Sequence, residues 1–579
     1  MKRFRSVLLP VSVLAIFCVA WLWWNHSDRV DMAATVPGDS LVYLEADSLP
    51  QILRAVTGTD AWKTLAPVAG VGASFGSVGW LSRLAAWTGI GPADAVVFAR
   101  AQVAVAVLNF ETTAGSVKPR AAAVIETHTG ERRTRAAIEK RVGDFAQHAY
   151  SNIRVERKQL DGAEWTTWSQ TNTSSDETDR RIIAAITGSL AVIGNDEQAV
   201  RACLAVHNGE RPSLAVDRQM TAMRGRVASN ESLAFGYVSP AGAAKLLEVA
   251  AAVYASQISL NPRAQSFAAS LLPQLAGKVL GSIGWSARSS DGQIEDRYFL
   301  SLQNGVAARL RDALAPSPSL TFNAGEFLPA GTYSTTRYNY LDPSAAWRGL
   351  NDAVSSQLDS LSASLVQTFL NAALQPYGIE DPSQFFRAIG SEIVTARLDD
   401  TGESTVLMAE VRDEKALRTL VARRLGASAR IERVGETEML VSRDATREAA
   451  AFVAGHLIVG SRESLRRCLV AYSEHRTLAS TNSFQLTARS SLAANVKGAL
   501  TLTNDERAAR ELILFVAAQS GARPRAADKE ELKRALESLR FAVTETRPVE
   551  EGFERITHSS FGQFGALARL FSDDEQKQR

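Results

Sequence analysis

The chain has 579 residues, of which 46% are hydrophobic and 22% are charged, values typical of a folded globular protein. Its formal net charge is only +2 at pH 7. There is thus no excess of cationic side chains to neutralise phosphates, which argues against a nucleic-acid partner.

The first predicted element is a membrane anchor. Residues 7–24 form an apolar run that follows the basic residues Lys2, Arg3 and Arg5. A helix of this length spans about 27 Å, just enough for the hydrocarbon core of a bilayer. Because a positive flank stays in the cytoplasm, we expect residues 1–6 to lie inside and the bulk of the chain to lie outside.

A cleaved signal peptide is the alternative to this anchor. Such a peptide needs small residues after its apolar core, but Trp21, Trp23 and Trp24 stand there. The sequence therefore favours an uncleaved, single-pass signal anchor in the inner membrane, followed by a linker at 25–35, with the remaining chain in the periplasm.

Beyond the linker, strands and helices follow one another without regular β-α alternation. In the first half we predict strands at 40–45, 102–108, 121–127, 154–158, 164–169, 181–186, 190–193 and 233–238, and helices at 132–147, 196–207 and 240–255. Asp161-Gly162 and Asp291-Gly292 are strong hairpin turns. In the second half we predict strands at 392–398, 405–411, 450–459 and 498–503, a hairpin at 430–441, and helices at 414–425, 462–472 and 504–518.

The second half repeats landmarks of the first in the same order. Residues 190–194 lead into a helix that ends with Cys203-Leu204, and residues 457–460 lead into one that ends with Cys468-Leu469. A repeat of this length predicts two domains. We place lobe 1 at 36–302, a linker at 303–325, lobe 2 at 326–564 and a charged tail at 565–579.

Tight turns between neighbouring strands require antiparallel pairing. The predicted fold class is therefore α+β: an N-terminal transmembrane helix followed by two tandem similar lobes, each a mostly antiparallel sheet with helices covering one face.

One catalytic motif stands out, a G-x-S-x-G around Ser74. Serine hydrolases expose such a serine between a strand and a helix. Residues 66–71 make a poor strand, however, and no parallel βαβ pattern surrounds them, so we interpret the motif as a connection between helical segments. No nucleotide-binding fingerprint is present either.

Metal and acid–base sites are not predicted. The histidines show no metal-ligand spacing, and His128 and His148 merely bracket a helix. Glu45 and Asp47 correspond to Arg337 and Asn339 in the second copy, so no pair of carboxylates recurs. We predict no catalytic, cofactor-binding or metal site, and no cofactor.

The remaining conspicuous residues are predicted to be structural. Cys203 and Cys468 occupy equivalent helix positions in separate lobes, which indicates buried thiols without a disulfide. Trp62 and Trp347 are also paired in the two copies. We interpret both as core residues, with a ligand platform as the alternative.

The anchor, the opening at Val36–Tyr43 and the strand at 190–194 that leads into a helix resemble an uncharacterised bacterial family of signal-anchored envelope proteins, a domain of unknown function. The resemblance implies the topology and carries no activity.

Three functional hypotheses follow. The first is a membrane-tethered, non-enzymatic envelope protein that binds or scaffolds a partner, attached to the membrane through residues 7–24. The second is a carrier or sensor for an apolar ligand or lipid, which a deep apolar cavity would favour. The third is a serine hydrolase using Ser74.

Overall fold

The computed structural model describes most of the chain. The described residues are 29–71, 97–113, 116–150, 152–170, 180–258, 277–303, 305–317, 323–356, 358–360, 363–364, 367, 374, 379–426, 429–443, 448–487, 498–519 and 526–566. The predicted anchor at 7–24 and the motif around Ser74 lie outside them. Within the described ranges, every helix is too short or too polar to cross a bilayer.

The fold is α+β with antiparallel strand pairing, as predicted. Contacts divide the chain into two compact units. Unit 1 comprises Met1–Gln51, Val78–Glu111 and Lys118–Asp217, and unit 2 comprises Ile52–Ser77, Thr112–Val117 and Arg218–Arg579.

Unit 1 contains seven described strands and the helices that cover them. The strands are β1 (Val42–Ala46), β2 (Gln102–Thr113), β3 (Ser116–Glu126), β4 (Ile153–Leu160), β5 (Ala163–Gln170), β6 (Arg181–Thr187) and β7 (Leu190–Gly194). The helices are η1 (Met32–Thr35), α6 (Glu131–Ala149), α7 (Glu197–His207) and η2 (Leu214–Val216), while α2 (Leu49–Gly58) spans the division between the units.

Unit 2 is larger. Its strands are β8 (Ala234–Val238), β9 (Leu280–Ser290), β10 (Gln293–Leu302), β11 (Ser334–Asn339), β12 (Ile389–Arg397), β13 (Thr405–Val411), β14 (Arg430–Val434), β15 (Thr437–Val441), β16 (Glu448–Val453), β17 (His456–Ser461), β18 (Ala499–Thr503), β19 (Ala542–Val549) and β20 (Gly552–Ser559). Its helices are α3 (Asp60–Val68), α8 (Arg218–Val227), α9 (Pro240–Ile258), α11 (Val306–Ala313), η3 (Asn323–Glu326), α12 (Pro343–Ser355), α14 (Pro382–Ala388), α15 (Glu414–Leu425), α16 (Arg462–Ser473), η5 (Leu478–Ser480), α17 (Asn482–Thr487), α18 (Glu506–Gln519) and α19 (Ala526–Glu537).

The strand pairings of the two units recur in the same order. The order β1-β2-β3-β7-β6-β5-β4 in unit 1 corresponds to β11-β12-β13-β17-β16-β15-β14 in unit 2. A backbone contact recurs as well: Leu214 N–H donates to Val36 O over 2.8 Å, and Leu478 N–H donates to Leu328 O over 2.7 Å. This recurrence is what a sequence duplication requires.

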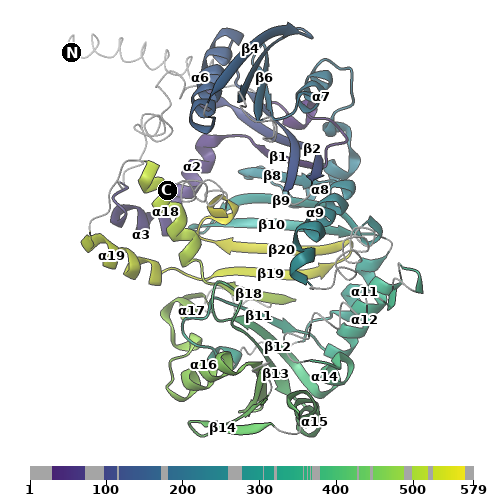
Figure 1. Ribbon diagram of the computed structural model, residues 1–579, viewed down its shortest axis with the longest axis vertical. Helices are drawn as coiled ribbons and strands as arrows, with labels where there is room; N and C mark the ends of the chain where they lie inside the picture. The colour runs from purple at the N-terminus through teal and green to yellow at the C-terminus, as the bar shows by residue number, and fades with distance from the viewer. Residues whose placement is uncertain are drawn as a thin grey trace, which may run out of the picture. The chain divides into compact units, whose positions relative to one another are not determined.

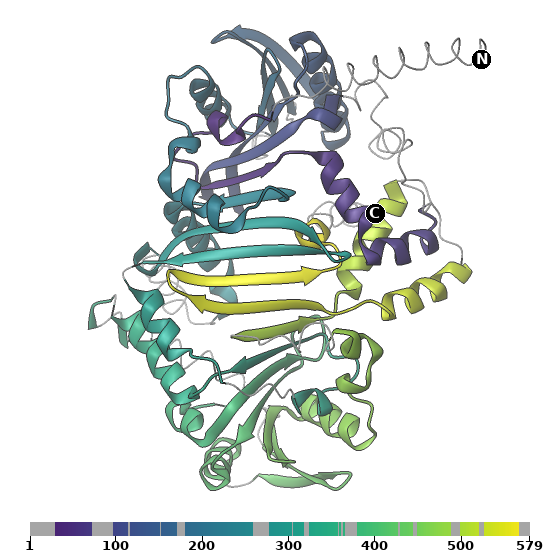
Figure 2. The same ribbon diagram turned by 180° about the vertical axis from the view of Figure 1, so that it is seen from behind.

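Two equivalent hairpins meet in unit 2. Hairpin β9–β10 closes the predicted lobe 1, hairpin β19–β20 closes the predicted lobe 2, and β10 lies beside β20 (Figure 1). The antiparallel register runs from Ile294 opposite Ser559 to Ser301 opposite Gly552. Seen from behind, the cyan and yellow hairpins again lie side by side (Figure 2). The compact units therefore do not follow the sequence repeat, because the end of lobe 1 belongs to unit 2.

A buried carboxyl group lies on this ladder. Asp296 of β10 accepts hydrogen bonds from Trp285 Nε1 over 2.9 Å and from the backbone N–H of Gln563 over 3.1 Å. Burial raises the pKa of Asp296 to about 6, against an opposing effect of these two donors. The Asp296 side chain thus ties β9, β10 and the segment after β20 together.

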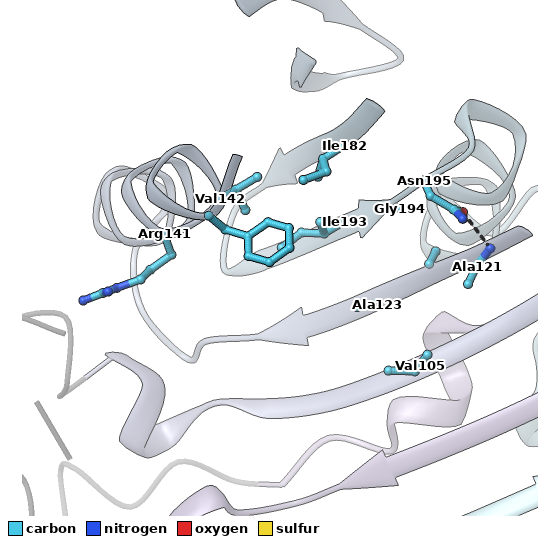
Figure 3. Close-up of a pocket in the computed structure, with 11 residues that line it drawn as sticks. Val105, Ala121, Ala123, Arg141, Val142, Ile182, Ile193, Gly194 and Asn195 are labelled. Atoms are coloured by element: carbon cyan, nitrogen blue, oxygen red, sulfur yellow. Dashed lines mark hydrogen bonds between the residues drawn. The ribbon is translucent and has the colours of Figure 1, made fainter. Parts of the chain in front are cut away.

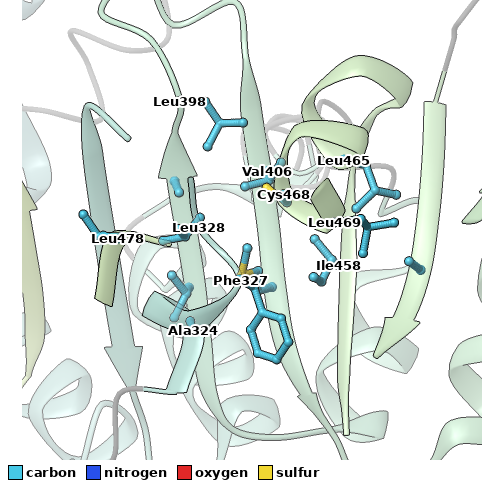
Figure 4. Close-up of a cluster of buried hydrophobic side chains, with 14 of the residues drawn as sticks. Ala324, Phe327, Leu328, Leu398, Val406, Ile458, Leu465, Cys468, Leu469 and Leu478 are labelled. Atoms are coloured by element: carbon cyan, nitrogen blue, oxygen red, sulfur yellow. The ribbon is translucent and has the colours of Figure 1, made fainter. Parts of the chain in front are cut away.

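Helices cover both faces of the unit 2 sheet. One core cluster joins Cys468 and Leu469 of α16 to Val406 and Ile458 (Figure 4). Another joins helix α15 to the alternate strand residues, including Leu457. The predicted cover on one face only is therefore wrong. The apolar run at 406–409 leaves neither face of β13 polar, which is typical of a strand buried on both sides.

A second correction concerns residues 450–459, for which the sequence analysis assigned no turn. The structure has two strands there, β16 and β17, joined at Ala454-Gly455. Both turn residues have positive φ values, 45° and 78°. Such a turn favours Asn or Asp followed by Gly, so an alanine in the first position gives no signal.

We expect Gly552→Ala to weaken the β10–β20 ladder. A Cβ at this position would collide with the carbonyl oxygen of Leu300. The substitution should lower the free energy of unfolding by roughly 1–3 kcal/mol, as overpacking does in tightly packed regions. Thermal unfolding of the detergent-solubilised full chain measures the effect.

Gly225→Ala is the matched control. Gly225 lies in α8, and a Cβ there would meet no atom within 4 Å. Alanine should leave stability unchanged or raise it by up to about 1 kcal/mol through its higher helix propensity. Equal melting temperatures for the two variants would contradict the ladder's role.

Candidate functional site

An open groove lies between α6 and the sheet of unit 1. Its volume is about 430 Å³. The strands contribute Val105, Ala121, Ala122, Ala123, Ile182, Ile193 and Gly194, Asn195 follows β7, and α6 contributes Arg141, Val142 and Phe145 (Figure 3). Apart from Arg141 and Asn195, every lining side chain is apolar.

Small side chains create the hollow. Ala121 and Ala123 of β3 line it with small side chains on one face of the sheet, because alternate residues of a strand point to the same face. The large ring of Phe145 remains 62% exposed. The sheet face below α6 is therefore incompletely covered.

Asn195 does not make the groove polar. Its Oδ1 accepts a hydrogen bond from Ala121 N–H over 3.0 Å, and its Nδ2 donates to Pro119 O over 2.7 Å. Both bonds hold the end of β7 against β3. The amide is thus engaged with backbone, and the groove offers its apolar walls to a ligand.

Unit 2 has a hollow at the corresponding place. Gly194 and Gly460 occupy the same place in the β3–β7 and β13–β17 ladders, so the residues before them, Ile193 and Val459, correspond. Ile193 lines the groove of unit 1, and Val459 lines the hollow of unit 2. This hollow measures only about 40 Å³. Ile379 and Phe385 are part of its wall.

An arginine held by two carboxylates lines the unit 2 hollow. Arg424 Nε and Nη2 donate to the two carboxylate oxygens of Glu448 over 2.7 and 2.6 Å, and Nη1 donates to Glu380 Oε1 over 2.7 Å. These bonds raise the pKa of the Arg424 guanidinium. Two carboxylates therefore fix the guanidinium beside the sheet.

Arg141 is the counterpart of Arg424 in unit 1. Each arginine lies ten residues after the first residue of its helix, Glu131 or Glu414 (141 − 131 = 424 − 414 = 10). Ile183 pairs with Gly194 in unit 1 as Ala449 pairs with Gly460 in unit 2, so Ile183 and Ala449 correspond. The residue before each of them is Ile182 in unit 1 and Glu448 in unit 2. The groove keeps the arginine and has an isoleucine in place of that carboxylate.

Each unit also contains a buried polar cluster that the sequence analysis missed. In unit 1, Gln102 Oε1 lies 2.9 Å from His128 Nε2, and Gln102 Nε2 donates to Asp47 Oδ1 over 3.2 Å. His128 has a φ of 51°, and its N–H donates to Glu126 over 2.8 Å.

In unit 2, Glu392 takes the position of Gln102 and lies 3.4 Å from Arg337 Nε and 3.7 Å from His456 Nε2. The hydrogen bond to Glu392 raises the pKa of His456. The sequence pointed to these clusters only through one correspondence: Glu45 and Asp47 of the first copy match Arg337 and Asn339 of the second. Among the described residues, no group of three or more His, Cys, Asp or Glu side chains is placed to hold a metal ion.

The residues singled out from sequence behave as follows. His128 contacts Gln102, whereas His148 Nδ1 lies 2.6 Å from Asp144 O of its own helix. Cys203 and Cys468 are buried and free, as predicted, and burial raises the pKa of both thiols to about 12.

Trp62 and Trp347 are buried, as predicted. The ring of Trp347 stacks on Phe386, with 5.3 Å between the ring centroids. Both tryptophans therefore contribute to packing.

Comparisons with known proteins give no relative: no family model matches the chain, and no curated protein or solved structure is significantly similar to it. The resemblance to signal-anchored envelope proteins stays a prediction.

We expect Cys203 and Cys468 to resist thiol reagents in the native protein. A buried thiol with a raised pKa carries almost no thiolate, and thiolate is the reactive form. The third cysteine of the chain, Cys18, lies in the predicted anchor and is replaced by serine for this test. Ellman's reagent should then react slowly before denaturation and with both remaining thiols in urea. Rapid reaction of either cysteine in the folded protein would contradict the burial.

Proposed function

We propose that the chain is a membrane-tethered, non-enzymatic binding protein of the bacterial envelope, and that its ligand is an apolar chain held in the unit 1 groove. Residues 7–24 anchor it in the inner membrane, and lobes 36–302 and 326–564 are two copies of one unit. The first copy has an open groove, and the corresponding hollow of the second copy is much smaller.

The groove is the observation that carries this proposal. Its volume of about 430 Å³ lies in the range of small-molecule sites, roughly 300–1,000 Å³. Covering exposed apolar surface stabilises a complex by about 25 cal/mol per Å². A hydrocarbon chain gains this free energy without leaving a polar group unsatisfied, because the walls are apolar.

The membrane anchor supports a lipid-like ligand. An anchored protein meets the bilayer's amphiphiles at high local concentration, since tethering makes the encounter effectively intramolecular. A protein partner is less well supported, because Phe145 is the single large exposed hydrophobic residue among the side chains that line the groove.

The topology has a direct test. Alkaline phosphatase fused after Arg579 should be active, because the enzyme requires export and we place the carboxyl end outside the cytoplasm. The same fusion without residues 1–24 should be inactive. An inactive full-length fusion in intact cells would overturn the orientation, and a mature protein beginning near Ala34 would show that the anchor is cleaved.

The ligand proposal is tested by photo-crosslinking in proteoliposomes. A long-chain alcohol that carries a diazirine on its alkyl chain should label peptides that contain Ala121–Ala123 and Val142–Phe145. Ala123→Trp fills the groove and should abolish the labelling. The matched variant Ala136→Trp lies on the exposed face of α6 and should preserve it.

Peptides of α15 provide an internal control, because the hollow beneath that helix has little space. Labelling that is equal on α6 and α15, or unaffected by Ala123→Trp, would contradict the proposal.

A further inference from the structure

We propose that unit 2 binds a phosphate monoester in a second open groove, which we call the arginine groove. Hairpin β14–β15, the residues directly after it and the start of α16 line this groove, and its volume is about 950 Å³. The lining includes one acidic residue, Glu463, and four arginines, which are Arg430, Arg443, Arg462 and Arg466. The inference goes beyond the proposed function and does not depend on it, because the apolar groove belongs to unit 1.

Glu432 holds two of these arginines in place. Its Oε1 lies 3.0 Å from Arg430 Nε, and its Oε2 lies 3.0 Å from Arg462 Nε. Both contacts use Nε, which leaves the terminal N–H groups of each guanidinium for other acceptors. A side chain that is already fixed loses less conformational entropy when it binds a ligand. Glu432 therefore organises two cations at the groove.

Unit 1 has an ion pair at the corresponding place, with the opposite polarity. Lys158 and Glu432 correspond, since each lies three residues before the two-residue turn of its hairpin. Glu197 and Arg462 correspond as the first residues of α7 and α16. Lys158 Nζ lies 3.4 Å from Glu197 Oε1, and the equivalent pair in unit 2 is Glu432 with Arg462. The cation is thus on the hairpin in unit 1 and on the helix in unit 2.

The next arginine of the helix is neutralised in unit 1. Arg201 of α7 and Arg466 of α16 each follow the first helix residue by four positions. Arg201 Nε and Nη2 donate to Glu197 Oε1 over 3.1 and 2.8 Å, and its Nη1 donates to Asp161 Oδ2 over 3.0 Å. Two carboxylates of the chain therefore satisfy this guanidinium.

Arg466 lacks both of these acceptors. Arg462 stands at the first helix position, and Gly435 stands at the first turn position, where unit 1 has its two carboxylates. Within the described ranges, no carboxylate forms an ion pair with Arg466 or with the exposed Arg443. The arginine groove thus gathers cations at a place where unit 1 pairs them with carboxylates.

A phosphate monoester fits this groove better than a carboxylate. It carries a charge of about −1.5 to −2 at pH 7 and three strong acceptor oxygens, and arginine binds phosphate through two parallel hydrogen bonds. Arg462 and Arg466 repel each other, because like charges four positions apart on a helix are destabilising. A doubly charged ligand contacts several cations at once and offsets this repulsion, whereas a carboxylate brings a single charge.

Calorimetric titration of the detergent-solubilised full chain with glycerol 3-phosphate tests the site. We expect saturable binding at low ionic strength, and acetate should bind about tenfold more weakly or less. Arg466→Gln should weaken binding of the phosphate about tenfold or more, as the loss of a charge-assisted hydrogen bond implies. Arg433→Gln is the matched control, because Arg433 lies on β14 outside the lining and pairs with Glu438 over 3.5 Å. This variant should bind as the native chain does.

An exchange of charges separates a built site from diffuse attraction. The double variant Glu432→Lys with Arg462→Glu reproduces the unit 1 pair and leaves the total charge of the chain unchanged. Its helix carboxylate lies four positions before Arg466 and should engage that guanidinium as Glu197 engages Arg201. We expect binding to weaken about tenfold or more. An unaltered melting temperature reports that the variant still folds.

A soluble ester and a lipid head group both present this phosphate, and a further titration distinguishes them. Dihexanoyl phosphatidic acid carries the monoester on a short-chain lipid, and dihexanoyl phosphatidylcholine is its diester control. Equal affinities for phosphatidic acid and glycerol 3-phosphate identify a soluble ester as the ligand. Tighter binding of phosphatidic acid, with weak binding of phosphatidylcholine, identifies a lipid head group.

Three results would overturn the inference. They are the absence of saturable binding of either monoester, equal affinities of the native and charge-exchanged proteins, and equal affinities for acetate and glycerol 3-phosphate. None of them bears on labelling of the unit 1 groove, so the proposed function stands or fails separately.

Discussion

The antiparallel ladder between β10 and β20 is the contact on which the arrangement of unit 2 depends. It joins the hairpin that ends the first sequence copy to the hairpin that ends the second, so the repeat boundary cannot coincide with a structural boundary. Cutting the chain between the copies would leave β10 and β20 as unpaired edges, which are prone to aggregate. The ladder explains why the compact units divide near Asp217 and not in the linker that the sequence suggests.

Local structure could be predicted where the signal is local. The hairpins at Asp161-Gly162 and Asp291-Gly292 form as expected, with positive φ at both residues of each turn. Helix α15 has the predicted limits, Glu414–Leu425, because Asp413 caps its first turn. The turn at Ala454-Gly455 gave no such signal. The β10–β20 ladder was also out of reach, since it joins strands that are distant in sequence and carry no mutual pattern.

The candidate site could be predicted only in part. The paired cysteines, tryptophans and acidic positions showed which residues correspond in the two copies. The groove itself depends on alanines in β3 lying opposite α6, and that register is set by tertiary pairing of four strands. The clearest sign of the groove in the sequence is a difference between the two copies: the first has Ile182 where the second has Glu448. That difference acquires meaning only after the strands are aligned and Arg424 is seen to bind Glu448.

The buried Asp296 gives the β10–β20 joint an unusual dependence on acidity. Its pKa rises from an ordinary 3.8 to about 6 in the folded protein, so near pH 5 the folded chain holds a proton that the unfolded chain has released. The resulting stabilisation is complete below about pH 3.8 and is lost as the pH rises through about 6. A carboxylate in a salt bridge behaves in the opposite way. The place where the two copies join is therefore favoured by mild acid, and at neutral pH Trp285 and Gln563 must hold a charge that the fold would otherwise exclude.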